Sequence, residues 1–79
     1  MGVLIDGKKL YEDDDLVVYS FISADGPSAG RIVAVKADFT QRIIVPNQEF
    51  EKVAIRIIMK AYKESVSAGL WPDTVVYAG

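Results

Sequence analysis

The fold is decided by residues 47–69, NQEFEKVAIRIIMKAYKESVSAG, which predict one long helix. Asn47 directly follows a proline and is a good N-cap residue. Gly69 suits the left-handed position just after a helix, and Pro72 blocks any continuation. The sequence therefore predicts a helix over residues 48–68, about 31 Å long at 1.5 Å per residue.

This helix is apolar on two of its faces. With residues placed at steps of about 100°, one stripe is expected to cover a sheet. It comprises Phe50, Val53, Ala54, Ile57, Ile58 and Ala61. A second apolar stripe, called the helix stripe below, comprises Ile55, Met59, Tyr62 and Val66. A helix on one face of a small sheet needs only the first stripe, so the helix stripe requires another partner.

Two kinds of partner could cover the helix stripe. Either the N-terminal segment or Leu70-Trp71 folds over it, or a second subunit does. We expect a homodimer through the helix stripe, because monomers usually avoid contiguous apolar patches and a twofold axis lets one patch cover its own copy.

The remaining face of the predicted helix is basic. This basic ridge comprises Lys52, Arg56, Lys60 and Lys63. A solvated face is the ordinary interpretation, because cations near the C-terminal end suit the helix dipole. The alternative is a site for phosphate or for an acidic partner. Single-stranded nucleic acids prefer aromatic residues interleaved with the cations, and the ridge contains none.

The residues on either side of the helix read as strands. Asp6-Gly7, between residues 3–5 and 8–11, predicts a two-residue turn and hence an N-terminal hairpin. β-Branched and aromatic residues predict three main strands at 16–22, 31–37 and 39–45 and a short final strand at 74–78. The expected fold is a single α+β domain over residues 1–79. It combines an antiparallel meander sheet, one long helix packed on one face, and a short C-terminal strand.

The apolar alternation in these strands predicts a core. Residues 16–22 are mainly apolar on both alternating faces, so this strand is expected to be central or to lie in an oligomer. The predicted core comprises Val18, Ile22, Val33, Val35, Ile43, Val45, Phe50, Val53, Ile57, Ile58 and Ala61.

Four consecutive acids break the strand pattern near the N-terminus. They are Glu12, Asp13, Asp14 and Asp15. Adjacent carboxylates repel one another and favour water, so a solvated turn is expected, with docking on a basic partner as the alternative. No metal site is expected, because a calcium loop needs alternating ligands and a glycine at its sixth position.

Composition excludes most catalytic arrangements. The chain has 79 residues, no cysteine and no histidine, which removes thiolate chemistry and the usual general base. Half of the residues are apolar (51%) and the net charge is −2, which argues against nonspecific nucleic-acid binding. No stretch approaches about 18 consecutive apolar residues, so we expect a soluble cytoplasmic protein that does not enter a membrane.

These features predict a small protein-interaction module without enzymatic activity and without a cofactor. Inhibitor, immunity and antitoxin-type proteins are of this kind. The expected partners are a second copy of the chain and another protein. Two alternatives stay open: a nucleic-acid-binding protein that uses the basic ridge, and a small ligand-binding protein or enzyme.

Overall fold

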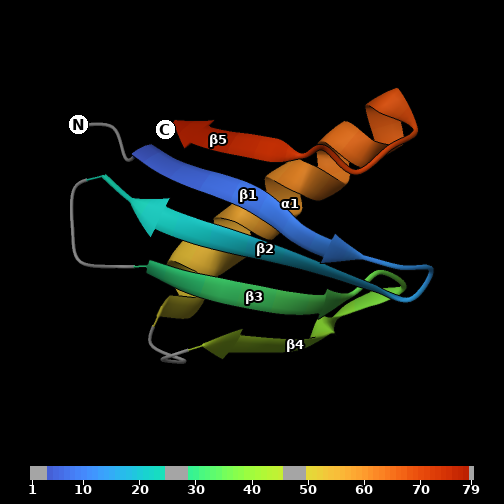
Figure 1. Ribbon diagram of the computed structural model, residues 1–79, viewed down its shortest axis with the longest axis horizontal. Coiled ribbons are helices and arrows are strands. Elements are labelled where there is room, and N and C mark those ends of the chain that lie inside the picture. The colour runs from blue at the N-terminus through green and yellow to red at the C-terminus, as the bar shows by residue number, and fades with distance from the viewer. Residues whose placement is uncertain (1–3, 25–28, 46–49, 79) are drawn as a thin grey trace.

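The computed structural model describes residues 4–24, 29–45 and 50–78. Along the chain it contains β1 (Leu4–Glu12), β2 (Leu16–Ser23), β3 (Ala29–Val35), β4 (Asp38–Val45), α1 (Glu51–Ala68) and β5 (Thr74–Ala78). The strands form one antiparallel sheet in the order β4-β3-β2-β1-β5. Figure 1 shows α1 running diagonally behind this sheet. The predicted α+β fold is confirmed.

The helix ends where the sequence predicts. α1 stops at Ala68, and Gly69 follows with a φ of 81°, a left-handed conformation that glycine adopts without a steric penalty. The Gly69 N–H donates to the Ser65 carbonyl over 2.8 Å and so satisfies one of the last helical acceptors. The predicted N-cap, Asn47, lies outside the described residues.

The helix carries the chain from one edge of the sheet to the other. β4 forms one edge, and after α1 the chain returns as β5 beside β1. The β5 register runs from Leu4 opposite Ala78 to Lys8 opposite Thr74. β2 is the middle strand, as the apolar character of both its faces predicts.

The N-terminal hairpin predicted at Asp6-Gly7 is wrong. β1 runs through both residues, with Gly7 opposite Phe21 on one side and Val75 on the other. The reason for a glycine here is packing: a Cβ at Gly7 would lie 2.7 Å from the Ile57 Cγ2, closer than carbon atoms approach. The chain turns later, at the acidic residues between β1 and β2.

The core lies between α1 and the sheet. Its buried side chains are Ile5, Val17, Tyr19, Phe21, Ile32, Ala34, Ile44, Ala54, Ile57, Ile58, Ala61 and Val75. The helix residues predicted for the core are confirmed: Ile57, Ile58 and Ala61 are buried, and Phe50 and Val53 pack against them.

For the sheet residues the predicted core is wrong, because these residues lie on the face of the sheet opposite α1. Val18, Ile22, Val33, Val35, Ile43 and Val45 alternate with the buried residues and point away from α1. Ile22 and Ile43 are 58% and 61% exposed. The alternation could not decide between the two faces, because in β2 both are apolar.

Candidate interaction surfaces

The sheet face opposite α1, called the outer face, carries a contiguous apolar surface. Residues directly opposite each other in neighbouring strands share a face, so the register defines rows across the sheet. The Tyr11 row comprises Tyr11, Val18, Val33 and Ile43. In the adjacent Leu16 row, the apolar residues are Leu16 and Val35, and Asp38 of β4 ends the row opposite Val35. Leu10 is the extra residue of a bulge in β1 and lies beside Tyr11. These seven apolar residues are the outer patch.

The outer patch is open to solvent. Leu10, Tyr11 and Ile43 are 50%, 54% and 61% exposed, while the remaining four side chains partly shield one another. A hollow at the β2–β4 end of the patch is lined by apolar side chains and two polar ones: Leu16, Val33, Val35, Ile43, Gln41 and Arg42. In Figure 1 α1 lies behind the sheet, so the outer face is the side toward the viewer. The register places the patch at the strand ends near the β1–β2 and β3–β4 turns.

The outer patch lies between opposite charges. The next row away from the turns is Lys8, Ser20 and Arg31, which puts two cations beside the Tyr11 row. No ion pair between described residues involves Lys8 or Arg31. On the other side, the β1–β2 turn carries the exposed Asp14 and Asp15. The order along the strands is therefore basic row, apolar patch, acidic turn.

The helix stripe is partly covered within the chain. Ile55 packs against the core, and the Tyr62 ring lies 6.3 Å from the Trp71 ring, as the intramolecular alternative predicts. Tyr62, Met59 and Val66 nevertheless remain 40%, 41% and 68% exposed. Dimerisation through the helix stripe stays a prediction, with less apolar surface to bury than four free side chains would offer.

The basic ridge lies on the solvent side of α1. Lys52, Lys60 and Lys63 are exposed, and the guanidinium of Arg56 lies 5.5 Å from the ring centroid of Tyr77, in a cation–π arrangement. Sequence reasoning missed Tyr77, because β5 and α1 become neighbours only in the folded chain. Anion binding by the ridge stays a prediction.

The acidic residues that sequence analysis singled out do not act as one group. Asp13 builds the turn: its Oδ1 accepts hydrogen bonds from the backbone N–H groups of Asp15 (2.8 Å) and Leu16 (2.7 Å). Its Oδ2 accepts one from the Tyr11 hydroxyl at 2.8 Å. The Tyr11 hydrogen bond and these backbone donors hold the pKa of Asp13 below its usual value.

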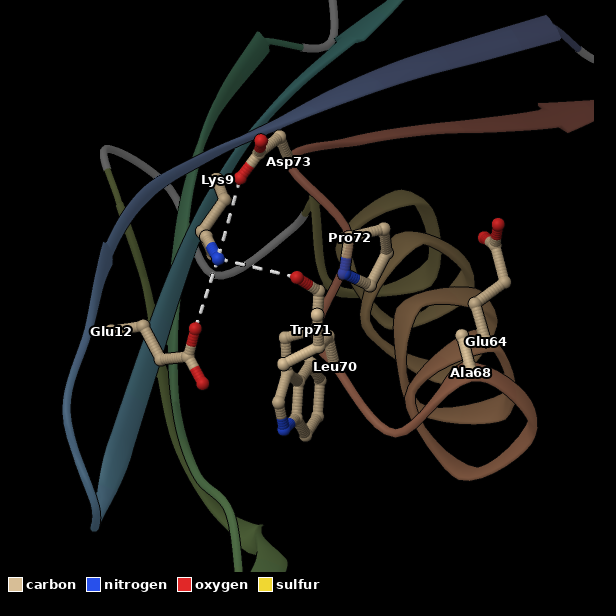
Figure 2. A pocket seen from close by; sticks show the side chains of 8 residues that line it. All are labelled: Lys9, Glu12, Glu64, Ala68, Leu70, Trp71, Pro72 and Asp73. Carbon is tan, nitrogen blue, oxygen red and sulfur yellow. Dashed lines mark hydrogen bonds and ion pairs between the residues drawn. The ribbon is translucent and has the colours of Figure 1, made fainter.

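Glu12 belongs to a small ionic network. Its carboxylate accepts from Lys36 Nζ at 2.6 Å and from Lys9 Nζ at 2.9 Å, and these hydrogen bonds, Lys36 first, lower the pKa of Glu12. Figure 2 shows the Lys9 ammonium at the centre of three contacts: Glu12, the Trp71 carbonyl at 3.2 Å and the Asp73 carboxylate at 3.4 Å. Among the described residues, no hydrogen bond or ion pair involves the carboxylates of Asp14 and Asp15, although the Asp15 carbonyl accepts from the Lys36 N–H at 2.9 Å.

The network lies at the wall of an open pocket beside the α1–β5 loop. Its lining residues are Lys9, Glu12, Glu64, Ala68, Leu70, Trp71, Pro72 and Asp73 (Figure 2). The hydrogen bond to Glu12 is the main cause that raises the pKa of Lys9. Lys9 thus keeps its charge and fastens the loop to β1, which is a structural role.

Tyr19 ties the same loop to the middle of the sheet. Its ring is fully buried, 6.4 Å from the Trp71 ring, and its hydroxyl donates to the Pro72 carbonyl. Burial is the main cause that raises the pKa of Tyr19 above its ordinary value of 10.0. The hydroxyl therefore stays protonated where an exposed tyrosine would ionise.

The Tyr19→Phe variant should reveal this hydrogen bond through its pH dependence. At neutral pH we expect a loss of about 1–2 kcal/mol of unfolding free energy, because the Pro72 carbonyl loses its donor. A raised folded-state pKa stabilises the fold below the unfolded pKa, and this contribution declines as pH rises above about 10 toward the folded value. The difference between wild type and Tyr19→Phe should therefore shrink above pH 10 in urea unfolding. A constant difference would contradict the buried, protonated hydroxyl.

Among residues 4–24, 29–45 and 50–78, no group of three or more possible metal ligands occurs. In the same ranges, no helix is long and apolar enough to cross a membrane. Comparison with known proteins finds no matching family model, no matching curated protein and no matching solved structure.

Proposed function

We propose that this chain is a noncatalytic protein-interaction module whose binding surface is the outer patch. The observation that carries the proposal is that patch itself: apolar side chains from four adjacent strands, on a sheet face that no described element covers. Monomers usually avoid exposing a contiguous apolar surface of this kind. Where a protein does expose a large apolar patch, the patch often marks a protein-binding site. An inhibitor, immunity or antitoxin-type protein is the kind of module that we propose.

The state of the titratable groups also supports a noncatalytic role. Proton transfer near neutral pH needs groups whose pKa lies close to it. The pKa of Glu12 is lowered and the pKa of Lys9 is raised, so both move away from neutrality and stay charged. Their contacts stabilise the α1–β5 loop. The chain contains no histidine or cysteine that could transfer protons near neutral pH instead.

Site-specific photo-crosslinking tests the proposal. A photo-crosslinking amino acid is placed at Ile43, in the outer patch, and in a matched variant at Val66, which is similarly exposed but lies on α1. Each variant is irradiated alone and in extract from the native source. We expect a discrete protein adduct from position 43 and none from position 66, and the adduct's partner should bind again when purified. Equal or absent labelling at both positions would contradict the proposal.

The nucleic-acid alternative is distinguished by a different surface. Binding through the basic ridge would appear as a salt-dependent gel shift that Lys60→Glu abolishes. If the chain binds its partners only through the outer patch, no such gel shift is expected.

A further inference from the structure

We propose that a second copy of this chain covers the outer patch, in a twofold dimer whose two sheets pack face to face. The inference rests on the proposed function, in that it names the occupant of the same surface. In this dimer each of the strands β1–β4 crosses over its own copy and runs in the opposite direction, so the twofold axis lies across the strands.

Charge selects this arrangement. A twofold axis across the strands inverts the order of basic row, outer patch and acidic turn. Asp14 and Asp15 of each copy then come over the Lys8 end of the other copy's basic row, with Arg31 one strand further along that row. An axis along the strands would instead bring acid against acid and base against base. Complementary charges at the rim of an interface fix its register and speed association. The surface is therefore complementary to itself in one orientation only.

The dimer needs the whole of the patch and its charged rim. The lower end of stable interfaces is about 1,200 Å² in total, or about 600 Å² from each copy, and three side chains of the patch are at least half exposed. Packed sheets lie about 10 Å apart, so side chains from both copies interdigitate. We expect a dissociation constant in the micromolar range.

The hollow in the outer patch gives the dimer a specific contact. With the axis between the two apolar rows, the Tyr11 row of one copy lies over the Leu16 row of the other. Ile43, at the β4 end of its row, then comes over the β4 end of the opposite copy's Leu16 row, at the rim of the hollow and beside Val35 and Asp38. The most exposed side chain of the patch becomes the anchor of the interface, and the twofold axis repeats the contact.

Sedimentation velocity from about 5 to 500 μM tests this dimer. Wild type is expected to shift from monomer to dimer over this range, and Ile43→Lys should raise the dissociation constant at least about tenfold, since it places a charge in the apolar seam. The matched control is Val66→Lys, which adds the same charge to an exposed apolar position on the helix stripe. It should dimerise like wild type. Circular dichroism at low concentration confirms that each variant is folded.

A charge swap tests the orientation without touching the apolar patch. Arg31→Glu should weaken the dimer, and Arg31→Glu combined with Asp14→Lys and Asp15→Lys should restore it. Added salt at about 0.5 M should weaken wild type as well, because exposed rim charges are screened. Weakening by Arg31→Glu without restoration would overturn the proposed orientation.

Other outcomes separate this inference from the proposed function. A wild type that stays monomeric at every concentration overturns the dimer. In that case an adduct between position 43 and a different protein still supports the interaction module, whereas the absence of any adduct overturns both. A dimer that Met59→Lys or Val66→Lys abolishes, and Ile43→Lys does not, would assign self-association to the helix stripe and overturn the inference.

Discussion

Phe21→Ala is expected to reduce the free energy of unfolding by about 3–5 kcal/mol, the usual loss when a buried phenylalanine is truncated. The Phe21 ring is fully buried between β2 and α1 and meets the Phe50 ring edge-on, with centroids 6.4 Å apart. Its removal leaves a cavity that the neighbouring backbone, fixed on both sides by sheet hydrogen bonds, cannot close. Much of the stability of a chain this small would be lost.

The matched control is Ile22→Ala, at the next residue of the same strand. Ile22 points to the outer face and is 58% exposed, so truncation should cost less than about 1 kcal/mol in the monomer. Both variants are compared by urea unfolding at low protein concentration, where self-association contributes little. Equal losses at the two positions, or a larger loss for Ile22→Ala, would contradict the assignment of the two sheet faces.

Gly7→Ala is expected to cost about 1–3 kcal/mol, although alanine suits a strand at least as well as glycine does. The new methyl group would lie 2.7 Å from the Ile57 Cγ2 and 3.1 Å from its Cδ1. Ile57 is buried and β-branched, so its rotamer cannot easily change. The helix must therefore move away from β1, and contacts along the core are lost.

A double-mutant cycle isolates this contact. Ile57→Ala alone should cost about 2–5 kcal/mol. Combined with Gly7→Ala it should cost no more, because the new methyl group enters space that the isoleucine has vacated, which makes the two changes strongly non-additive.

The control for the cycle is Gly69→Ala. Nothing lies within 4 Å of a Cβ there, and the cost of about 1–2 kcal/mol comes from the left-handed φ of 81°. This cost should be the same with Ile57 or with alanine at position 57. Additivity at Gly7, or coupling at Gly69, would contradict the packing explanation.

A local sequence signal correctly predicted the end of the helix, whereas a similar signal in β1 predicted a turn that the structure does not contain. In β1 a tertiary contact explains the glycine. The end of α1 depends on Gly69 and its immediate neighbours, which act within a few residues. Asp6-Gly7 is an equally local turn signal, yet the glycine serves the approach of Ile57, a residue fifty positions later. No pattern in residues 1–12 distinguishes a glycine required by a turn from one required by a distant side chain.

The choice of sheet face could not be predicted for a related reason. Val18 and Tyr19 are neighbours on opposite faces of β2, and valine is the more typical core residue. Tyr19 is nevertheless buried, because the α1–β5 loop supplies the Pro72 carbonyl for its hydroxyl. That acceptor lies more than fifty residues away in the sequence.

The sequence predicted surplus apolar surface but not all of its places in the fold. The sequence carries more apolar surface than one core can bury, and periodicity assigned the surplus to the helix stripe. The structure places much of it on the outer face instead, with Val18, Val33, Val35 and Ile43, all predicted for the core, in the outer patch. Within the helix stripe, Tyr62 lies beside Trp71 and Ile55 packs against the core.

The most direct test of the outer patch as the interaction surface is an NMR dilution series with labelled methyl groups. Between about 1 mM and 20 μM, we expect resonances of Leu10, Val18, Val33 and Ile43 to shift with concentration, as the micromolar association inferred above requires. The Met59 and Val66 methyl resonances should stay constant. Shifts confined to Met59 and Val66, or no concentration dependence at Ile43, would contradict the account.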